Sequence, residues 1–417
     1  MNGKQRLAGA LSHTEGPVPL DLGATAITGI HCSIVEKLRE YYGLEKKPVR
    51  VSEMFQMLGA VEDDLVEALG ADIIGYPSPY NMFSVREENY KEWKTPWGQE
   101  VLVPGDFHVS ERDGAVFTYP GGDRSVGPSA RIPEGGFFFD AIERQGPLDE
   151  DSLNPRDNCE EYAALDEFSL EFFRANRERY TGSRYGVVGG PGGTGLGDIA
   201  FIPGIGLKRP KGVRTVEEWY VSTVTRPELL HEIFALQTEM SLTNLQTYHS
   251  IVGDCVDVTV VCGTDFGTQI ATFCSRETLL RLYVPYYRMM NDWIHSHTNW
   301  KTFKHTCGAI EPFIDTFVNC GFDIINPVQW TAAGMDRETL KKKHGADIVF
   351  WGAGVDTQKT LPFGTPKDVR SEVLECLKIF AKGGGFVCNA IHNVQAKTPI
   401  ENVVALVDAV KEFNGER

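Results

Sequence analysis

Short β-branched segments, each followed by a helical pattern, recur along this chain and constrain its fold more than any other feature. Each run ends in Gly, Pro, Asn or Asp, and few of the runs alternate cleanly between apolar and polar residues. Such runs are typical of strands that are buried on both faces of a parallel sheet. Eight units with intervening helices predict an α/β fold of the (β/α)8 TIM barrel type. The eight runs are residues 18–22, 72–76, 185–189, 257–262, 301–305, 323–327, 347–351 and 385–391.

The helices expected after the last two strands have clear start signals. Thr365 and Thr398 are each followed directly by Pro and, three residues on, by Asp368 or Glu401. This spacing predicts that each Thr caps a helix with Pro in its first turn. The segments between these strands and helices are then loops at the C-terminal face of the barrel, where TIM-barrel enzymes carry their active sites.

One region does not follow the repeat. Residues 92–103 and 107–117 have the pattern of β-hairpins, and a Pro- and Gly-rich acidic stretch follows them. A length of 417 residues fits one large barrel with an insertion. We therefore interpret residues 1–417 as a single barrel domain that contains an insertion over residues 80–165, near the N-terminal third. This segment is expected to be a lid or a partner-docking surface.

Charge and cysteine content exclude several classes of protein. The net charge of −16 argues against binding to nucleic acid or to an anionic membrane surface. The nine cysteines are scattered through apolar runs, which is typical of free thiols in a reducing cytosol. The polar start of the chain does not resemble a signal peptide, and no apolar run reaches the roughly 18 residues needed to span a bilayer. We expect a soluble, cytoplasmic protein of undetermined oligomeric state.

The pair His305 and Cys307 is the clearest chemical signal. Two residues apart on an extended strand, their side chains lie on one face, and imidazole and thiolate are preferred ligands of tetrahedral zinc. A second strand-like run, residues 386–393, offers Cys388 and His392. If the two strands are neighbours, three ligands can hold one zinc and leave a position open for catalysis. We prefer His392 as the third ligand because Cys388 lies inside its strand, and Cys388 remains the alternative.

Further polar residues follow predicted strands. Asp265 closes a strongly apolar run and is expected either to orient a zinc ligand or bind substrate, or else to be a helix N-cap or a turn residue. We group it with His305 and Cys307 as the candidate catalytic residues. The candidates for substrate contact are Gln329, Asp356 and Gln358.

Residues 190–195 match the G-x-G-x-x-G pattern and follow a strand. The residues after them do not form an amphipathic helix that could present its N-terminus to a pyrophosphate. We therefore expect a loop that shapes the mouth of the pocket, and no dinucleotide site.

Five motifs in the last 160 residues together resemble the uroporphyrinogen decarboxylase superfamily, and more closely its zinc-dependent, corrinoid-linked methyltransferase branch. They are residues 263–269, 305–308, 323–329, 350–358 and 392–402, and residues 21–29 look like the same branch. The resemblance implies a (β/α)8 barrel with zinc at its C-terminal mouth. In the methylcobamide:coenzyme M members the ligands are His-x-Cys and a later Cys. That later position falls at His392 here, which is a departure from the family pattern.

The decarboxylase proper is not favoured. Its N-terminal signature of closely spaced arginines has no counterpart in this chain, whose corresponding segment begins at Asp21. A substrate with eight carboxylates needs Arg or Lys partners. The first 50 residues offer only Arg6, Arg39, Arg50 and a few lysines.

The resemblance implies a zinc methyltransferase of the O-demethylation type, which moves a methyl group between a small methoxylated substrate and a corrinoid. Aromatic residues near the predicted mouth, Phe266, Trp330 and Trp351, favour an aryl methyl ether. The chain has no Asp-x-His-x-x-Gly corrinoid signature, so the corrinoid (cobalamin) is expected on a partner protein that docks over the mouth. The alternatives are a methyl-corrinoid:thiol methyltransferase, a metal-free decarboxylase, and a non-enzymatic sensor or scaffold.

Overall fold

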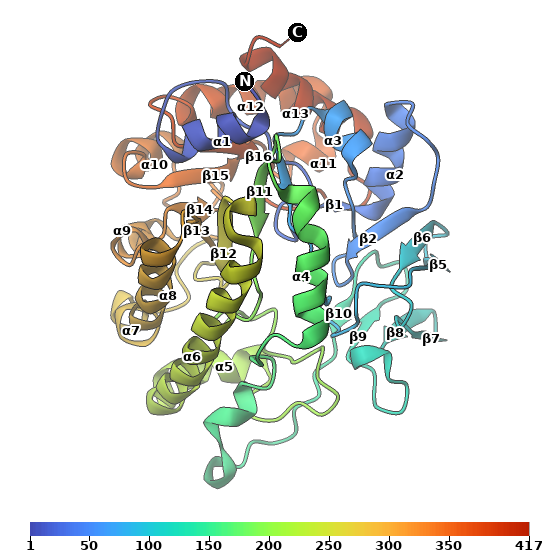
Figure 1. The fold of residues 1–417 in the computed structure, drawn as a ribbon, viewed down its shortest axis with the longest axis vertical. Coiled ribbons are helices and arrows are strands. Elements are labelled where there is room, and N and C mark those ends of the chain that lie inside the picture. The colour runs from blue at the N-terminus through green and yellow to red at the C-terminus, as the bar shows by residue number, and fades with distance from the viewer. Residues whose placement is uncertain (417) are drawn as a thin grey trace.

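The computed structural model describes residues 1–416, and at its centre lies a parallel sheet of seven strands (Figure 1). The strands neighbour one another in the order in which they occur along the chain, and every pair is parallel. This arrangement is a mixed α/β, TIM-barrel-like fold. The strands are β4 (Ile73–Gly75), β11 (Gly186–Gly189), β12 (Val258–Cys262), β13 (Lys301–His305), β14 (Ile324–Asn326), β15 (Val349–Ala353) and β16 (Phe386–Asn389).

The eighth predicted strand, residues 18–22, is not a regular strand. Leu20 forms only an isolated parallel bridge to Cys388. Cys388 N donates to Pro19 O, and Asp72 N donates to Leu20 O, so this segment joins the two edges of the sheet. Proline has no N–H to donate, and Pro19 interrupts the regular ladder of hydrogen bonds that a strand requires.

Helices lie outside the strands (Figure 1). Apolar side chains from the strands form a cluster in the space that the strands enclose. Helix α1 (Gly3–Leu11) contributes Leu7 and Ala10 to this interior cluster and so covers the N-terminal end of the sheet. The remaining helices of four or more residues are α2 (Cys32–Tyr41), α3 (Asp63–Leu69), α4 (Glu167–Tyr180), α5 (Val216–Thr225), α6 (Pro227–Val252), α7 (Arg276–Leu282), α8 (Val284–His297), α9 (Glu311–Asn319), α10 (Arg337–His344), α11 (Thr360–Phe363), α12 (Pro366–Phe380) and α13 (Ile400–Phe413). No helix within residues 1–416 is long and apolar enough to cross a membrane.

The two predicted helix starts differ in outcome. Thr365 caps α12 and forms a capping box with Asp368, as predicted. Helix α13 begins at Ile400, with Pro399 at the N-cap and no side-chain cap. The hydroxyl of Thr398 donates to Gln395 O instead, so the preceding turn uses the group that was expected to cap the helix.

Two smaller sheets lie at one side of the molecule, and their strand pairs are antiparallel except for the parallel pair of β2 and β6 (Figure 1). One contains β1 (Ile30–His31), β2 (Val49–Glu53), β3 (Leu58–Gly59), β5 (Lys91–Lys94) and β6 (Glu100–Val103). The other contains β7 (Val109–Arg112), β8 (Ala115–Thr118), β9 (Ala130–Ile132) and β10 (Asp140–Ala141). Strands β1 to β3 precede residue 80, so the first of these sheets extends beyond the predicted segment 80–165. A lid or docking role for this region stays a prediction.

Candidate metal centre

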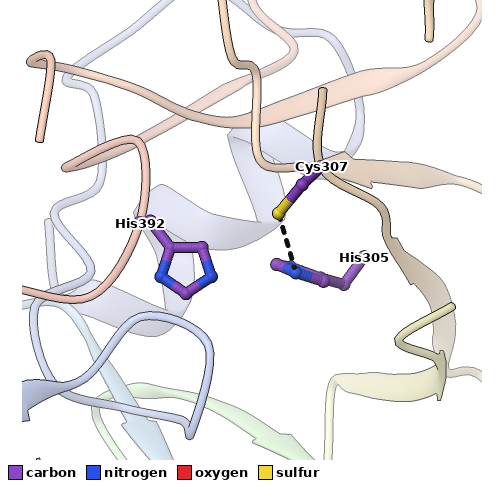
Figure 2. Close-up of side chains that lie close together, drawn as sticks. All are labelled: His305, Cys307 and His392. Atoms are coloured by element: carbon purple, nitrogen blue, oxygen red, sulfur yellow. Dashed lines mark hydrogen bonds between the residues drawn. The ribbon is translucent and has the colours of Figure 1, made fainter. Parts of the chain in front are cut away.

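The C-terminal end of β13 brings His305 and Cys307 together. Phe303 belongs to the interior cluster, and His305, two residues later, therefore faces the interior as well. Cys307 lies in the loop that follows. Its Sγ is 3.5 Å from Nε2 of His305 (Figure 2).

His392 reaches the same place from the loop after β16. The ring centroids of His305 and His392 are 5.6 Å apart (Figure 2). One potential ligand atom from each of His305, Cys307 and His392 lies within 4.8 Å of the others. The structure therefore places the preferred third ligand beside the predicted pair.

Asn326, the last residue of β14, fixes the protonation pattern of His305. Its Oδ1 lies 2.6 Å from Nδ1 of His305, while its Nδ2 donates to Trp351 O at 2.9 Å. The second bond sets the orientation of the amide, so Oδ1 must accept a hydrogen from Nδ1. Nε2 then carries the lone pair and faces Cys307, as a metal ligand requires. Sequence reasoning gave Asn326 no role, although a polar side chain at the end of an apolar strand was a usable signal.

Asp265 orients the loop that carries Cys307. Its Oδ1 accepts a hydrogen bond from Cys307 N at 2.7 Å and lies 3.9 Å from Nε2 of His305. The helix-cap alternative is wrong, because Ser275 caps the next helix, α7. The carboxylate therefore holds the backbone of Cys307 in the loop after β13 and lies near the His305 ring.

The loops that follow β12 and β13 touch backbone to backbone. Gly308 has a φ of 86°, and a Cβ at this position would lie 2.4 Å from the carbonyl carbon of Gly267. Ala309 N also donates to Thr268 O at 2.8 Å. Only glycine satisfies both the left-handed conformation and this close approach. The position of Cys307 is thus set by the neighbouring loop as well as by its own strand.

The candidate substrate residues make local contacts. Gln329 Oε1 accepts from Gly308 N at 2.9 Å, so this side chain supports the Cys307 loop. Asp356 Oδ1 accepts from Gln358 N, and Asp356 N donates to Glu372 in α12. Gln358 is exposed. A substrate contact for these three residues stays a prediction.

The aromatic residues expected to line the mouth have structural partners. Trp351 is fully buried, and its Nε1 donates to Asp21 Oδ2 at 2.9 Å. Trp330 Nε1 donates to Ala353 O. Phe266 packs among the rings of Tyr283, Phe313 and Phe317. Their apolar character follows from core packing, so the aromatic content near these strand ends does not identify an aryl substrate.

Cys388 is not part of the group. Val387 faces the interior cluster, whereas Phe386 and Cys388 belong to the cluster between the sheet and its helices. Successive side chains of a strand point to opposite faces, so Cys388 points away from His305. Its thiol is fully buried, and this burial raises its pKa far above the usual value.

Burial keeps the three candidate ligands uncharged. It lowers the pKa of His305, although nearby Asp265 opposes this shift. Burial, with the neighbouring His305, lowers the pKa of His392 to about 4. The pKa of Cys307 is raised well above its ordinary value, first by burial and then by Asp265. At neutral pH the site therefore holds two neutral imidazoles and one thiol, whose proton a metal would displace.

The donor set fits zinc. Tetrahedral zinc with Zn–S and Zn–N bonds of ordinary length separates its S and N ligand atoms by about 3.4–3.6 Å. The distance of 3.5 Å between Cys307 Sγ and His305 Nε2 matches this spacing. Two imidazoles and one thiolate leave a fourth position for substrate, the arrangement of catalytic sites. His305, Cys307 and His392 would hold the ion.

The glycine-rich run lies in the loop after β11 and precedes no helix until α5. Tyr162 Oη donates to Gly195 O at 2.9 Å, and Ser241 Oγ donates to Gly193 O at 2.6 Å. Side chains from outside the loop therefore fix its backbone, and it does not present a helix N-terminus to a phosphate.

Comparisons with known proteins agree with this architecture. Residues 209–413 match the family model "Uroporphyrinogen decarboxylase (URO-D)". A methyltransferase from Methanosarcina mazei shares the fold, with a TM-score of 0.54 over 99% of both chains and 16% sequence identity. Uroporphyrinogen decarboxylases of Coxiella burnetii (strain Dugway 5J108-111) and Psychromonas ingrahamii are 28% and 30% identical to this chain over 102 residues.

Those 102 residues are 24% of this chain and 26% or 27% of the two decarboxylases, so the chain spans about a quarter of the length of the curated relatives that it matches. The family match contains His305, Cys307 and His392, while the structural likeness extends over almost the whole fold. The sequence match is thus confined to the C-terminal half of the chain, and the structural likeness shows a shared fold.

Proposed function

We propose that this protein is a zinc-dependent methyltransferase that moves a methyl group between a small methoxylated substrate and a separate corrinoid protein. The observation that carries the proposal is the group of His305, Cys307 and His392, whose ligand atoms lie within 4.8 Å of one another at the C-terminal end of the sheet. Its sulfur and nitrogen donors suit zinc with an open position. The methyltransferase of shared fold makes this class of reaction the first one to test.

The chain's own residues would prepare the site for this chemistry. His305, Cys307 and His392 would hold zinc, which supplies Lewis acidity toward an ether oxygen of the substrate. Asn326 keeps Nε2 of His305 free of a proton, and Asp265 fixes the backbone of Cys307. In such a demethylation the ether oxygen would keep the bonding electrons and take up a proton, and the corrinoid of the partner would accept the methyl group.

Exposed apolar side chains support a partner that covers the mouth. Ile270 and Phe273 lie in the segment after β12, and Phe201 follows β11. Phe363, which is 84% exposed, follows β15 in α11. These segments all leave the C-terminal ends of parallel strands, where a corrinoid protein must approach to reach the zinc site.

The arginines near the N-terminus do not support a decarboxylase for a highly carboxylated substrate. Arg6 pairs with Asp72 and Glu416, and Arg39 pairs with Asp64. The guanidinium of Arg50 contacts Tyr90. These three cations are therefore engaged with other side chains of the protein, which leaves the methyltransferase as the better supported activity.

The test combines metal content with methyl transfer. We expect about one zinc per chain in protein purified without chelator, and none in His305→Ala or Cys307→Ala, because each change removes a ligand. With a Co(I) corrinoid protein and a panel of methoxylated aromatic compounds, the wild type should form methyl–Co(III), which is followed by its absorption spectrum. Both variants should be inactive.

Each other outcome favours a different activity. Methyl transfer from methyl–Co(III) to a thiol, without demethylation of any ether, would make the protein a methyl-corrinoid:thiol methyltransferase. Zinc-free protein that releases CO₂ from a tetrapyrrole or aromatic acid would contradict the proposal and favour a decarboxylase. Lys301→Met serves as the matched control, because Lys301 lies on β13, is half-buried and pairs with Asp323 away from the ligands.

A further inference from the structure

Lys304 is a fully buried cation directly behind the candidate metal centre. It lies on β13 beside His305, and its side chain is 0% exposed. Neighbouring residues of a strand point to opposite faces, so Lys304 faces the helices while His305 faces the barrel interior. The burial of a charged amine costs free energy unless the surrounding groups compensate for it. The side chain therefore needs a specific explanation.

The ammonium is compensated by carbonyl oxygens and aromatic rings. Nζ donates to Thr264 O and to His305 O, each at 2.6 Å. Within residues 1–416 it forms no ion pair with a carboxylate. Three ring centroids surround it: Phe266 at 5.1 Å, and Tyr287 and Phe317 at 5.7 Å each. These are cation–π distances.

From Cys262, the last residue of β12, every second residue contacts the ammonium of Lys304. Cys262 Sγ lies 3.7 Å from Nζ, Thr264 supplies its carbonyl oxygen, and Phe266 supplies its ring. Asp265, between the last two, binds Cys307 N instead. The pairing of β12 with β13 also shifts register between Val260 and Cys262, where these contacts begin.

We propose that Lys304 is a positioning residue of the metal centre: its ammonium holds residues 262–266 in the conformation that directs Asp265 at Cys307. The proposal rests on the proposed function for its metal, but the loop conformation that it explains exists without one. Lys304 joins this loop to the His305 carbonyl, and so fixes the two strand ends relative to each other. A neutral side chain would fill the same space without organising the loop.

The test begins with the metal-free protein. In Lys304→Met and Lys304→Gln, amide hydrogen exchange at Cys307 should accelerate at least about tenfold, because its bond to Asp265 is released. The melting temperature should stay within a few degrees of the wild type, since core packing is retained. Lys301→Met, on the same strand but half-exposed, should leave the exchange at Cys307 unchanged. Unchanged exchange in both Lys304 variants, or failure of both to fold, would overturn the proposal.

A double-mutant cycle then tests the link to the metal. Zinc affinity, measured by competition with a chromophoric chelator, should fall about tenfold or more in Lys304→Met and in Asp265→Asn. The double variant should lose little more than either single variant, because both act through one loop. Additive losses would overturn the positioning role. A wild type that binds no zinc would instead refute the proposed function, while the exchange experiment still decides the role of Lys304.

Discussion

Strands β13 and β16 both supply side chains to the candidate metal centre, but they do so differently. β13 ends with His305 on its interior face, and Cys307 follows in the next loop. β16 carries its cysteine, Cys388, on the outer face, and its ligand His392 comes only in the following loop. The comparison teaches that the face of the strand decides which side chain reaches the candidate metal centre. The presence of a favourable residue type near a strand end is not sufficient.

The largest expected effect is on zinc affinity, and it distinguishes His392, in the loop after β16, from Cys388 in the strand itself. His392→Ala should lower zinc affinity at least about 10³-fold, because it removes one of three protein ligands. Cys388→Ala should leave zinc affinity within about twofold, because its side chain belongs to the core cluster between the sheet and its helices. Chelator competition measures both affinities. The Cys388 variant should lose only stability, about 1–2 kcal/mol for a small buried side chain.

The reverse result would break the comparison. If Cys388→Ala lost zinc and His392→Ala kept it, β16 would have to present its outer face to the site, contrary to its register with β15. His392→Cys gives a finer test, since it restores the ligand type expected from the family resemblance. We expect it to retain about one zinc per chain, because thiolate and imidazole are both good zinc ligands.

A smaller effect is expected from the asparagines at the ends of β14 and β16. Asn326 holds Nδ1 of His305, so Asn326→Ala should lower zinc affinity about 10- to 100-fold, as for other groups that orient a metal-bound histidine. Asn389 occupies the last position of β16 and is equally buried, but its side-chain N and O have no hydrogen-bond partner. Asn389→Ala is therefore the matched control.

Zinc affinity is measured for both asparagine variants by the same competition. Equal losses in Asn326→Ala and Asn389→Ala would mean that any cavity at the strand ends weakens the site. In that case the hydrogen bond to His305 would not be the cause. Asn326→Asp keeps an acceptor for Nδ1 and should recover most of the lost affinity.

The parts of the structure that follow from local periodicity could be predicted from the sequence. Seven of the eight apolar runs overlap the strands of the sheet, and the His-x-Cys spacing brings two candidate ligands together, because Cys307 directly follows the end of β13. Residues 18–22 were harder to predict. Their hydrogen bonds go to Cys388 and Asp72, far away in the sequence, and Pro19 prevents a regular strand.

The supporting residues could not be predicted because their roles depend on contacts across strands. Asn326 matters only because β14 lies beside β13, and Lys304 matters because the segment after β12 folds over it. The orientation of Cys388 could not be predicted either. Both faces of its strand are apolar, so the sequence does not show which face points into the barrel. Trp351 shows the converse: its indole appeared suited to a pocket, but it packs inside the barrel and binds Asp21.

The smallest expected effect is the pH dependence of zinc affinity. It again distinguishes the ligands that follow β13 from the ligand that follows β16. Metal binding requires a thiolate and neutral imidazoles. The raised pKa of Cys307 keeps it protonated at pH 7–8, whereas the lowered pKa values of His305 and of His392, the latter about 4, keep both imidazoles neutral there. One proton must therefore leave as zinc binds. The logarithm of the zinc association constant should rise by about one for each pH unit between pH 7 and 8.

The proton released on zinc binding comes from Cys307, in the loop after β13. His392→Ala should bind zinc more weakly at every pH but keep the slope of about one, because Cys307 still loses its proton. Cys307→Ala should lose the slope along with the affinity. The measurement is chelator competition at several pH values, corrected for protonation of the chelator. A slope near two in the wild type would mean that a histidine is charged in the metal-free site, and a slope near zero would mean that Cys307 is already a thiolate. Either result would refute the charge state derived from burial. A histidine that titrates at neutral pH would have to be more exposed to solvent than His305 and His392 are in this fold.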